Sequence, residues 1–178
     1  MNLIGQLIGF TAVGISAIIF LQKDRKRILG IKLLTDVLWA VHHFLIGNII
    51  ASATTGIAIL REIIFIRKRK TVFMAIFIPL FFIPLLFTYK NITSLIPPVA
   101  SAAATLGFGN RNVNSIKAFG AASSVLMLIY GAFNNSFATV VNELIVLSSI
   151  AVSVKIDNKK YKFFIGKRKR NNVECRND

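Results

Sequence analysis

The sequence predicts an all-α membrane protein with seven transmembrane helices, arranged as two parallel three-helix repeats joined by a linker helix. Three observations support this prediction. The chain is 54% hydrophobic and only 16% charged, which is more apolar than a typical soluble domain. Its basic residues gather in short clusters between long uncharged runs, as in multi-pass membrane proteins. The second half of the chain also repeats the pattern of the first.

Seven segments are long enough to cross a bilayer core, which takes about 20 predominantly apolar residues. These segments are 2–21, 28–46, 48–66, 71–89, 92–109, 113–132 and 135–154. The first lacks a basic start and is followed by further spans, so we expect a retained helix and not a cleaved signal peptide. The fourth is rich in phenylalanine and apolar on every side, so we expect it to face lipid, with bends at Pro79 and Pro84.

The basic clusters predict the orientation of the chain. They follow the first, third and fifth spans and fill the tail, whereas Lys90 alone falls on the other side. The positive-inside rule therefore places the N-terminus outside and the tail in the cytoplasm. Because the clusters border apolar runs, we expect anionic lipid head groups as their counter-charge, and no nucleic-acid partner.

The repeat appears when the chain is shifted by about 88 residues. "LWAVHHFLIGN" from Leu38 then aligns with "LMLIYGAFNNS" from Leu126, with agreement at apolar and turn positions but few identities. A shift of four helices keeps both halves in one orientation, and transporters with such repeats bind their solute between them. The expected organisation is a first repeat (1–70), a linker (71–91), a second repeat (92–154) and a basic tail (155–178).

A polar stripe runs along the second span. At 100° per residue, Lys32, Asp36, Trp39 and His43 fall within roughly 60° of one another. An ionised side chain at mid-bilayer costs about 3 kcal/mol on insertion scales, so this stripe should face the bundle interior or water. Lys32 and Asp36 are four residues apart and can pair. The alternative is that this pair and Trp39 serve only to fix helix packing.

Other polar residues extend the candidate site. Asn142 and Glu143 lie in mid-span, and an intramembrane acid is a functional hypothesis by default; the alternative is a buried neutral carboxyl or a pair with Lys32 or Lys117. Arg61 and Glu62 lie close to "RKRK", so we expect them to snorkel to the cytoplasmic interface. The repeat matches Thr54 and Thr55 to Asn142 and Glu143. It also matches the charged stripe of span two to small residues of span six, namely Gly120, Ser124, Met127 and Gly131.

The layout resembles the SWEET and PQ-loop transporter superfamily. More narrowly, "HHFLIGNIIASATTGIAILREIIFIRK" (42–68) is similar to the bacterial inner-membrane YgjV-like proteins, distant relatives of that superfamily. The resemblance implies a multi-pass protein of the bacterial cytoplasmic membrane and a hinge at Pro97 and Pro98. Sugar-transporting relatives carry an asparagine pair at mid-span; Asn142 matches one member and Thr54 replaces the other. The proline–glutamine pair of the superfamily is absent.

These observations favour a transporter or facilitator of a small polar metabolite bound between the repeats. The expected solute contacts are Trp39, Thr54, Thr55, Asn142 and Glu143, and the expected proton-coupling or gating residues are Asp36, His43 and Glu62. We expect no enzyme, cofactor or metal, since the sequence has no Walker A loop, zinc spacing or Ser-His-Asp set. The alternative is a non-transporting receptor or assembly module that uses its basic, aromatic-containing tail at the lipid surface. The Gly5–Gly9 spacing permits a homo-oligomer.

Overall fold

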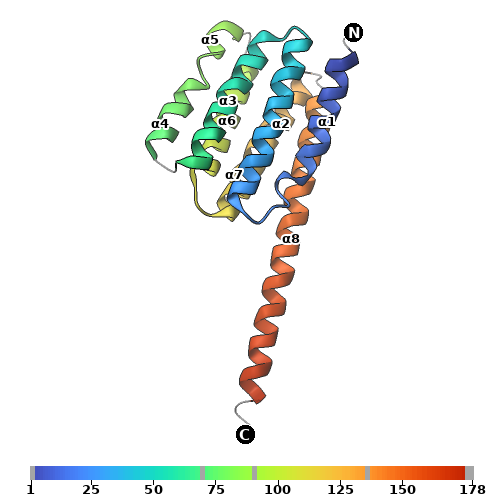
Figure 1. Cartoon of the computed structure of the whole chain (residues 1–178), viewed down its shortest axis with the longest axis vertical. Helices are drawn as coiled ribbons and strands as arrows, with labels where there is room; N and C mark the ends of the chain where they lie inside the picture. Colours follow the sequence, from blue (N-terminus) through green and yellow to red (C-terminus); the bar gives the residue numbers. More distant parts are fainter. Residues whose placement is uncertain (1–2, 69–70, 90–91, 135–136, 175–178) are drawn as a thin grey trace.

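The computed structural model describes residues 3–68, 71–89, 92–134 and 137–174. These residues form helices joined by short turns, so the all-α prediction is confirmed (Figure 1). The helices are α1 (Leu3–Ile19), α2 (Arg25–Leu45), α3 (Ile49–Arg67), α4 (Thr71–Leu80), α5 (Leu85–Thr88), the 3-10 helix η1 (Ile92–Leu95), α6 (Ile96–Gly109), α7 (Val113–Phe133) and α8 (Phe137–Glu174).

Several helices have the length and composition of membrane spans. Four candidates are long and apolar enough to cross a bilayer: Arg25–Leu45, Ile92–Gly109, Val113–Phe133 and Phe137–Asp157. Among the described residues, two further apolar helical stretches, Leu3–Ile19 and Val72–Phe87, are shorter. Large apolar side chains such as Phe10 and Leu86 lie on the outside, while charged side chains such as Arg61 and Glu62 are buried. An apolar exterior around a polar interior is the distribution expected of a bundle solvated by lipid.

The helices pack in chain order within each half of the bundle. α1 packs on α2 and α2 on α3, as α6 packs on α7 and α7 on α8. Contacts of α1 with α8 and of α3 with α6 join the two halves, and α4 packs against α6 and α3. Figure 1 shows α4 at the edge of the bundle. Gly47, at φ +82°, lies in the turn between α2 and α3, a conformation that glycine adopts without steric cost.

The predicted fourth span is interrupted. α4 ends at Leu80, and α5 starts again only at Leu85. Pro79 lies inside α4, and a proline removes one helical hydrogen bond and collides with the carbonyl four residues earlier. The amides between Phe82 and Phe87 that form turn bonds donate three residues back in place of four, as Phe82 does to the Pro79 carbonyl and Phe87 to the Pro84 carbonyl. The two prolines therefore break the segment 71–89, where the sequence predicted a bent but continuous helix.

Pro97 and Pro98 lie in the first turn of α6, directly after η1. The first amides of a helix have no helical partner, so proline is well tolerated there. The predicted span 92–109 thus consists of a 3-10 turn followed by a shorter α-helix. A hinge at these two residues stays a prediction.

Arg25, the first residue of α2, ties together three helices. It is buried, with 3% of its surface exposed. Its Nη1 donates to the Phe65 carbonyl at 2.9 Å, its Nη2 to the Phe108 carbonyl at 2.6 Å and its Nε to the Asn110 carbonyl at 3.0 Å. These carbonyls belong to the C-terminal ends of α3 and α6, which lack helical donors and attract a cation through the helix dipole.

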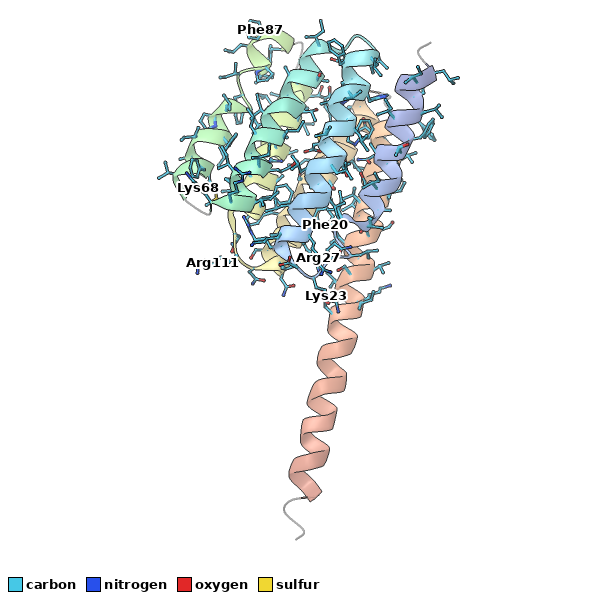
Figure 2. The ribbon with its side chains drawn as sticks, in the orientation of Figure 1. Phe20, Lys23, Arg27, Lys68, Phe87 and Arg111 are labelled. Carbon is cyan, nitrogen blue, oxygen red and sulfur yellow. The ribbon has the colours of Figure 1, made fainter. Side chains whose placement is uncertain are left out.

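A second cation ties the last two helices together at the same end of the bundle. Lys117 of α7 is buried and donates to Oδ2 of Asp157 in α8 at 2.6 Å. Lys23 lies 3.9 Å from the other carboxylate oxygen. Figure 2 shows Lys23, Arg27, Lys68 and Arg111 at this end, which we call the basic end, and Phe87 at the opposite end. α8 continues past the basic end as one helix to Glu174, through the segment that the sequence predicted as a tail (Figure 1).

We expect Arg25→Ala to lower the free energy of unfolding by about 3 kcal/mol, since three buried carbonyls lose a charged donor. Arg25→Lys should recover only part of this loss, because an ammonium lacks the planar set of donors. Thermal unfolding in detergent measures the change. The matched control is Arg27→Ala, whose side chain is exposed. Equal midpoints for both alanine variants would show that the three bonds add nothing to stability.

Candidate functional site

Charged side chains of α2 and α3 meet inside the bundle. Lys32 pairs with Asp36, as their spacing predicted. Lys32 Nζ also lies 3.9 Å from Oε1 of Glu62, and Nη2 of Arg61 lies 3.0 Å from the same oxygen. We call these four residues, Lys32, Asp36, Arg61 and Glu62, the charge tetrad. Its two cations balance its two carboxylates, which lowers the cost of burying each charge.

Arg61 also joins the tetrad to the second half of the bundle. Nη1 donates to Thr105 Oγ1 at 3.1 Å and to the Ser101 carbonyl at 3.4 Å, both in α6. The guanidinium carbon lies 5.1 Å from the ring centroid of Phe81 and 5.0 Å from that of Phe108. Both distances are within the range of cation–π attraction. Arg61 therefore has anionic, hydroxyl, carbonyl and aromatic partners in the interior.

The prediction that Arg61 and Glu62 snorkel to the cytoplasmic interface is wrong. Arg61 has 2% of its surface exposed and Glu62 has none. Their position near "RKRK" suggested an easy route to water. The interior partners in α2 and α6 satisfy these charges at their own depth, so neither side chain needs that route.

The two carboxyl groups of the tetrad lie within electrostatic contact of each other. Asp36 is 4% exposed. Oδ2 of Asp36 and Oε2 of Glu62 are buried and make no hydrogen bond to any described residue. The two carboxyl groups lie close enough for one proton to be shared between them as a hydrogen bond. A proton or a ligand with N–H groups would satisfy both.

Asn142 and Glu143 of α8 adjoin the tetrad through Lys32. Asn142 Nδ2 donates to Glu143 Oε1 at 3.0 Å. Glu143 also hydrogen-bonds with Ser124 of α7 and interacts electrostatically with Lys32. Of the two partners weighed from the sequence, Lys32 is therefore the one near Glu143, because Lys117 pairs with Asp157. We call the tetrad, Asn142, Glu143 and Ser124 together the polar network; it draws on α2, α3, α7 and α8.

An aromatic group lies on α2 on the side of the tetrad away from the basic end. The ring of Trp39 is 5.3 Å from that of His42, edge to face, and 5.6 Å from that of His43, stacked. His42 Nδ1 lies 2.7 Å from the Gly5 carbonyl, and a Cβ on Gly9 would come within 2.8 Å of this nitrogen. His42 thus serves the contact between α1 and α2. His43 Nδ1 is buried and makes no hydrogen bond to the described residues.

Thr54 and Thr55 are half-buried in α3, about two turns from Glu62. The Thr55 hydroxyl donates to the Ala51 carbonyl of its own helix at 2.8 Å, as intramembrane threonines often do. Their role as solute contacts stays a prediction.

Sequence patterns did not predict the roles of Arg25 and Thr105 or the central place of Arg61. Nothing in the sequence marks Arg25 as a cation whose partners are main-chain carbonyls of other helices. The sequence did contain a sign that Ser124 belongs to the site, because the repeat aligns Ser124 with Asp36. Its hydrogen bond to Glu143 shows that this small residue of the second half also serves the polar network.

The hollow surface between α1 and α8 lies apart from this chemistry. It has a volume of about 430 Å³ and an almost wholly apolar lining. The lining residues are Ala17, Leu21, Val141, Leu144, Ile145, Ser148, Ser149 and Val152. Among the side chains that the structure describes, no three His, Cys, Asp or Glu residues group as metal ligands would.

We expect Arg61→Leu and Glu62→Leu each to destabilise the protein by about 3 kcal/mol, because each leaves a buried charge without its partner. The double variant should cost less than the sum, since leucine replaces both charges with apolar packing. Chemical or thermal unfolding of all four proteins in detergent gives the coupling. Arg67→Leu, at the exposed end of the same helix, is the control. Strictly additive effects would mean that the Arg61–Glu62 ion pair is not a unit.

Comparison with known proteins adds a family to this description. No curated protein and no solved structure matches the chain. The sequence model of one family, Imp-YgjV, described as a bacterial inner membrane protein, matches residues 3–160. The match includes all the helices from α1 to α7 and the part of α8 that packs in the bundle. The buried ionic interior and apolar exterior agree with that location. The chain therefore belongs to the Imp-YgjV family of bacterial inner membrane proteins.

Proposed function

We propose that this protein is a transporter or facilitator of a small polar solute, which binds at the polar network between the two halves of the bundle. The observation that carries the proposal is a set of five ionisable side chains within apolar helices: Asp36, Arg61 and Glu62 are buried, and Lys32 and Glu143 are half-buried. Such groups are expensive in a membrane and mark substrate or ion pathways. A purely structural role in helix packing would not require buried carboxylate oxygens that have no hydrogen-bond donor among the described residues.

The packing pattern supports two equivalent halves. In each half the middle helix packs between the other two: α2 between α1 and α3, and α7 between α6 and α8. If α1, α2 and α3 correspond to α6, α7 and α8, the contact of α1 with α8 is equivalent to the contact of α6 with α3. This is the relation expected of parallel repeats about an axis along the membrane normal. It accords with the proposed 3+1+3 layout, with the resemblance to the SWEET and PQ-loop superfamily, and with a basic end in the cytoplasm.

The proposed roles follow from position. Asn142 and Glu143 bind the solute from α8, and Trp39 from α2, with Thr54 and Thr55 on the path in α3. Asp36, Glu62 and His43 are the proposed proton-coupling or gating residues, with His43 near the mouth opposite the basic end. Pro97 and Pro98, in the first turn of α6, provide the hinge between the halves.

A second candidate is favoured by α8. Its helix of 38 residues is about 57 Å long, while the bilayer core is about 30 Å thick. A helix that extends this far past the bundle suits a receptor or assembly module that engages anionic lipid or a partner protein. Truncation after Asp157 separates the candidates, because a transporter should retain flux and a tail-dependent module should lose its role.

We expect the Asn142→Ala, Glu143→Gln double variant to lose at least tenfold in the rate of solute flux into proteoliposomes. A ligand-stabilisation panel of sugars, amino acids, nucleosides, vitamins, amines and organic acids first names the solute, since binding raises the unfolding midpoint by mass action. Leu144→Ala, on the lipid-facing side of the same helix, is the control. Unchanged flux in the double variant would remove these residues from the site.

A further inference from the structure

We propose that the solute is a small organic monocation, an ammonium or guanidinium compound, that competes with a proton for the carboxyl groups of Asp36, Glu62 and Glu143. This inference rests on the proposed function and specifies its substrate class.

The charge count of the polar network motivates the proposal. Its three carboxyl groups face two permanent cations, Lys32 and Arg61. The tetrad is balanced when both of its carboxyls are ionised, so an ionised Glu143 adds one negative charge that no cation of the network matches. A net charge in a medium of low dielectric constant is costly. One further positive charge, on a proton or on a ligand, would neutralise the network.

Among the side chains that the structure describes, the neighbouring elements supply no such charge. α6 contributes the Thr105 hydroxyl and α7 the Ser124 hydroxyl. The other buried cations are engaged at the basic end, where Lys117 bonds Asp157 and Arg25 bonds three carbonyls.

The unsatisfied atoms point to the same class of ligand. Among the described residues, four buried atoms of the polar network make no hydrogen bond: the oxygens Asp36 Oδ2, Glu62 Oε2 and Asn142 Oδ1, and one donor, Arg61 Nε. The three acceptors outnumber the single donor, and two of them belong to side chains that are at least nine-tenths buried. An ammonium group presents three donors and no acceptor, and a guanidinium presents five donors. A carboxylate or phosphate solute would instead add acceptors and further negative charge.

The aromatic group on α2 adds a second means of recognition. Trp39 lies one turn beyond Asp36, on the polar stripe that also carries Lys32. Tryptophan offers the best aromatic face for an organic cation, whereas a strongly hydrated inorganic ion gains less there. A single excess charge also suits a monovalent solute better than a divalent metal ion. The geometry thus combines carboxylate oxygens with a ring face.

The test measures the unfolding midpoint of the full-length protein in detergent with three isosteric probes: propylammonium, 1-propanol and propionate. Guanidinium and tetramethylammonium, at the same low concentration, serve as two further cationic probes. We expect stabilisation by the cations alone. Their apparent affinity should fall up to tenfold per pH unit on acidification, because a proton competes for the same carboxyls. Binding should also release a proton, which calorimetry in two buffers of different ionisation enthalpy detects.

Two variants test where the cation binds. Glu62→Gln and Glu143→Gln each remove the excess negative charge from a different helix, so either should weaken cation binding at least tenfold. Asp24→Asn is the control, since this exposed carboxylate makes no capping bond. Loss of binding is attributed to the missing carboxylate only in a Gln variant whose size-exclusion profile and circular dichroism match those of the wild type.

The outcomes separate the substrate class from the proposed function. Stabilisation by a neutral or anionic solute, without any response to cations, would overturn the inference while leaving a transporter in place. A cation response that both Gln variants retain would move the site elsewhere and overturn the inference too. If no solute of any class stabilises the protein or crosses proteoliposomes that contain it, the proposed function fails and this inference fails with it.

Discussion

A charge buried in a lipid-solvated bundle must find its partner within the protein, and this constraint determines how the helices are placed. Arg25 fixes the start of α2 against the ends of α3 and α6. Lys117 holds α7 to α8 through Asp157. The charge tetrad sets which faces of α2 and α3 turn inward. Apolar packing alone would leave those rotations weakly specified, because lipid tails solvate leucine as well as a neighbouring helix does.

Much of the fold could be predicted from residue patterns. Apolar runs separated by basic clusters predicted the helices, and the spacing of Lys32 and Asp36 predicted their pair. The interior position of Asp36 followed from the cost of a charge in lipid. The features that the residue patterns did not predict depend instead on how residues act together. The break between Leu80 and Leu85 depends on how two prolines combine, and the burial of Arg25 and Arg61 depends on acceptors supplied by distant helices. A sequence shows which side chains need partners but seldom where the partners lie.

The candidate site was predicted in its parts but not in its assembly. Asp36, Glu62 and Glu143 were each recognised as candidates on three separate helices. Lys32 and Arg61 bring these acids into one network, since Arg61 bonds to Thr105 of α6 and Lys32 interacts electrostatically with Glu143 of α8. Most of the ionisable groups come from the first half, and the second half supplies Thr105, Ser124, Asn142 and Glu143. Membership in a bacterial inner-membrane family gives the location of this chemistry, and the chemistry itself has to be found in these side chains.

The length of α8 has a mechanical consequence. The helix contributes Asn142 and Glu143 to the polar network and then runs without interruption from Asp157 to Glu174, a rise of roughly 25 Å. A rigid rod of that length works as a lever arm. A tilt of roughly 10° at Glu143 would displace the far end by about 8 Å, since the arm from Glu143 to Glu174 is about 46 Å at a rise of 1.5 Å per residue. Small rearrangements around Glu143 would thus be amplified into a movement beyond the basic end that a partner could sense.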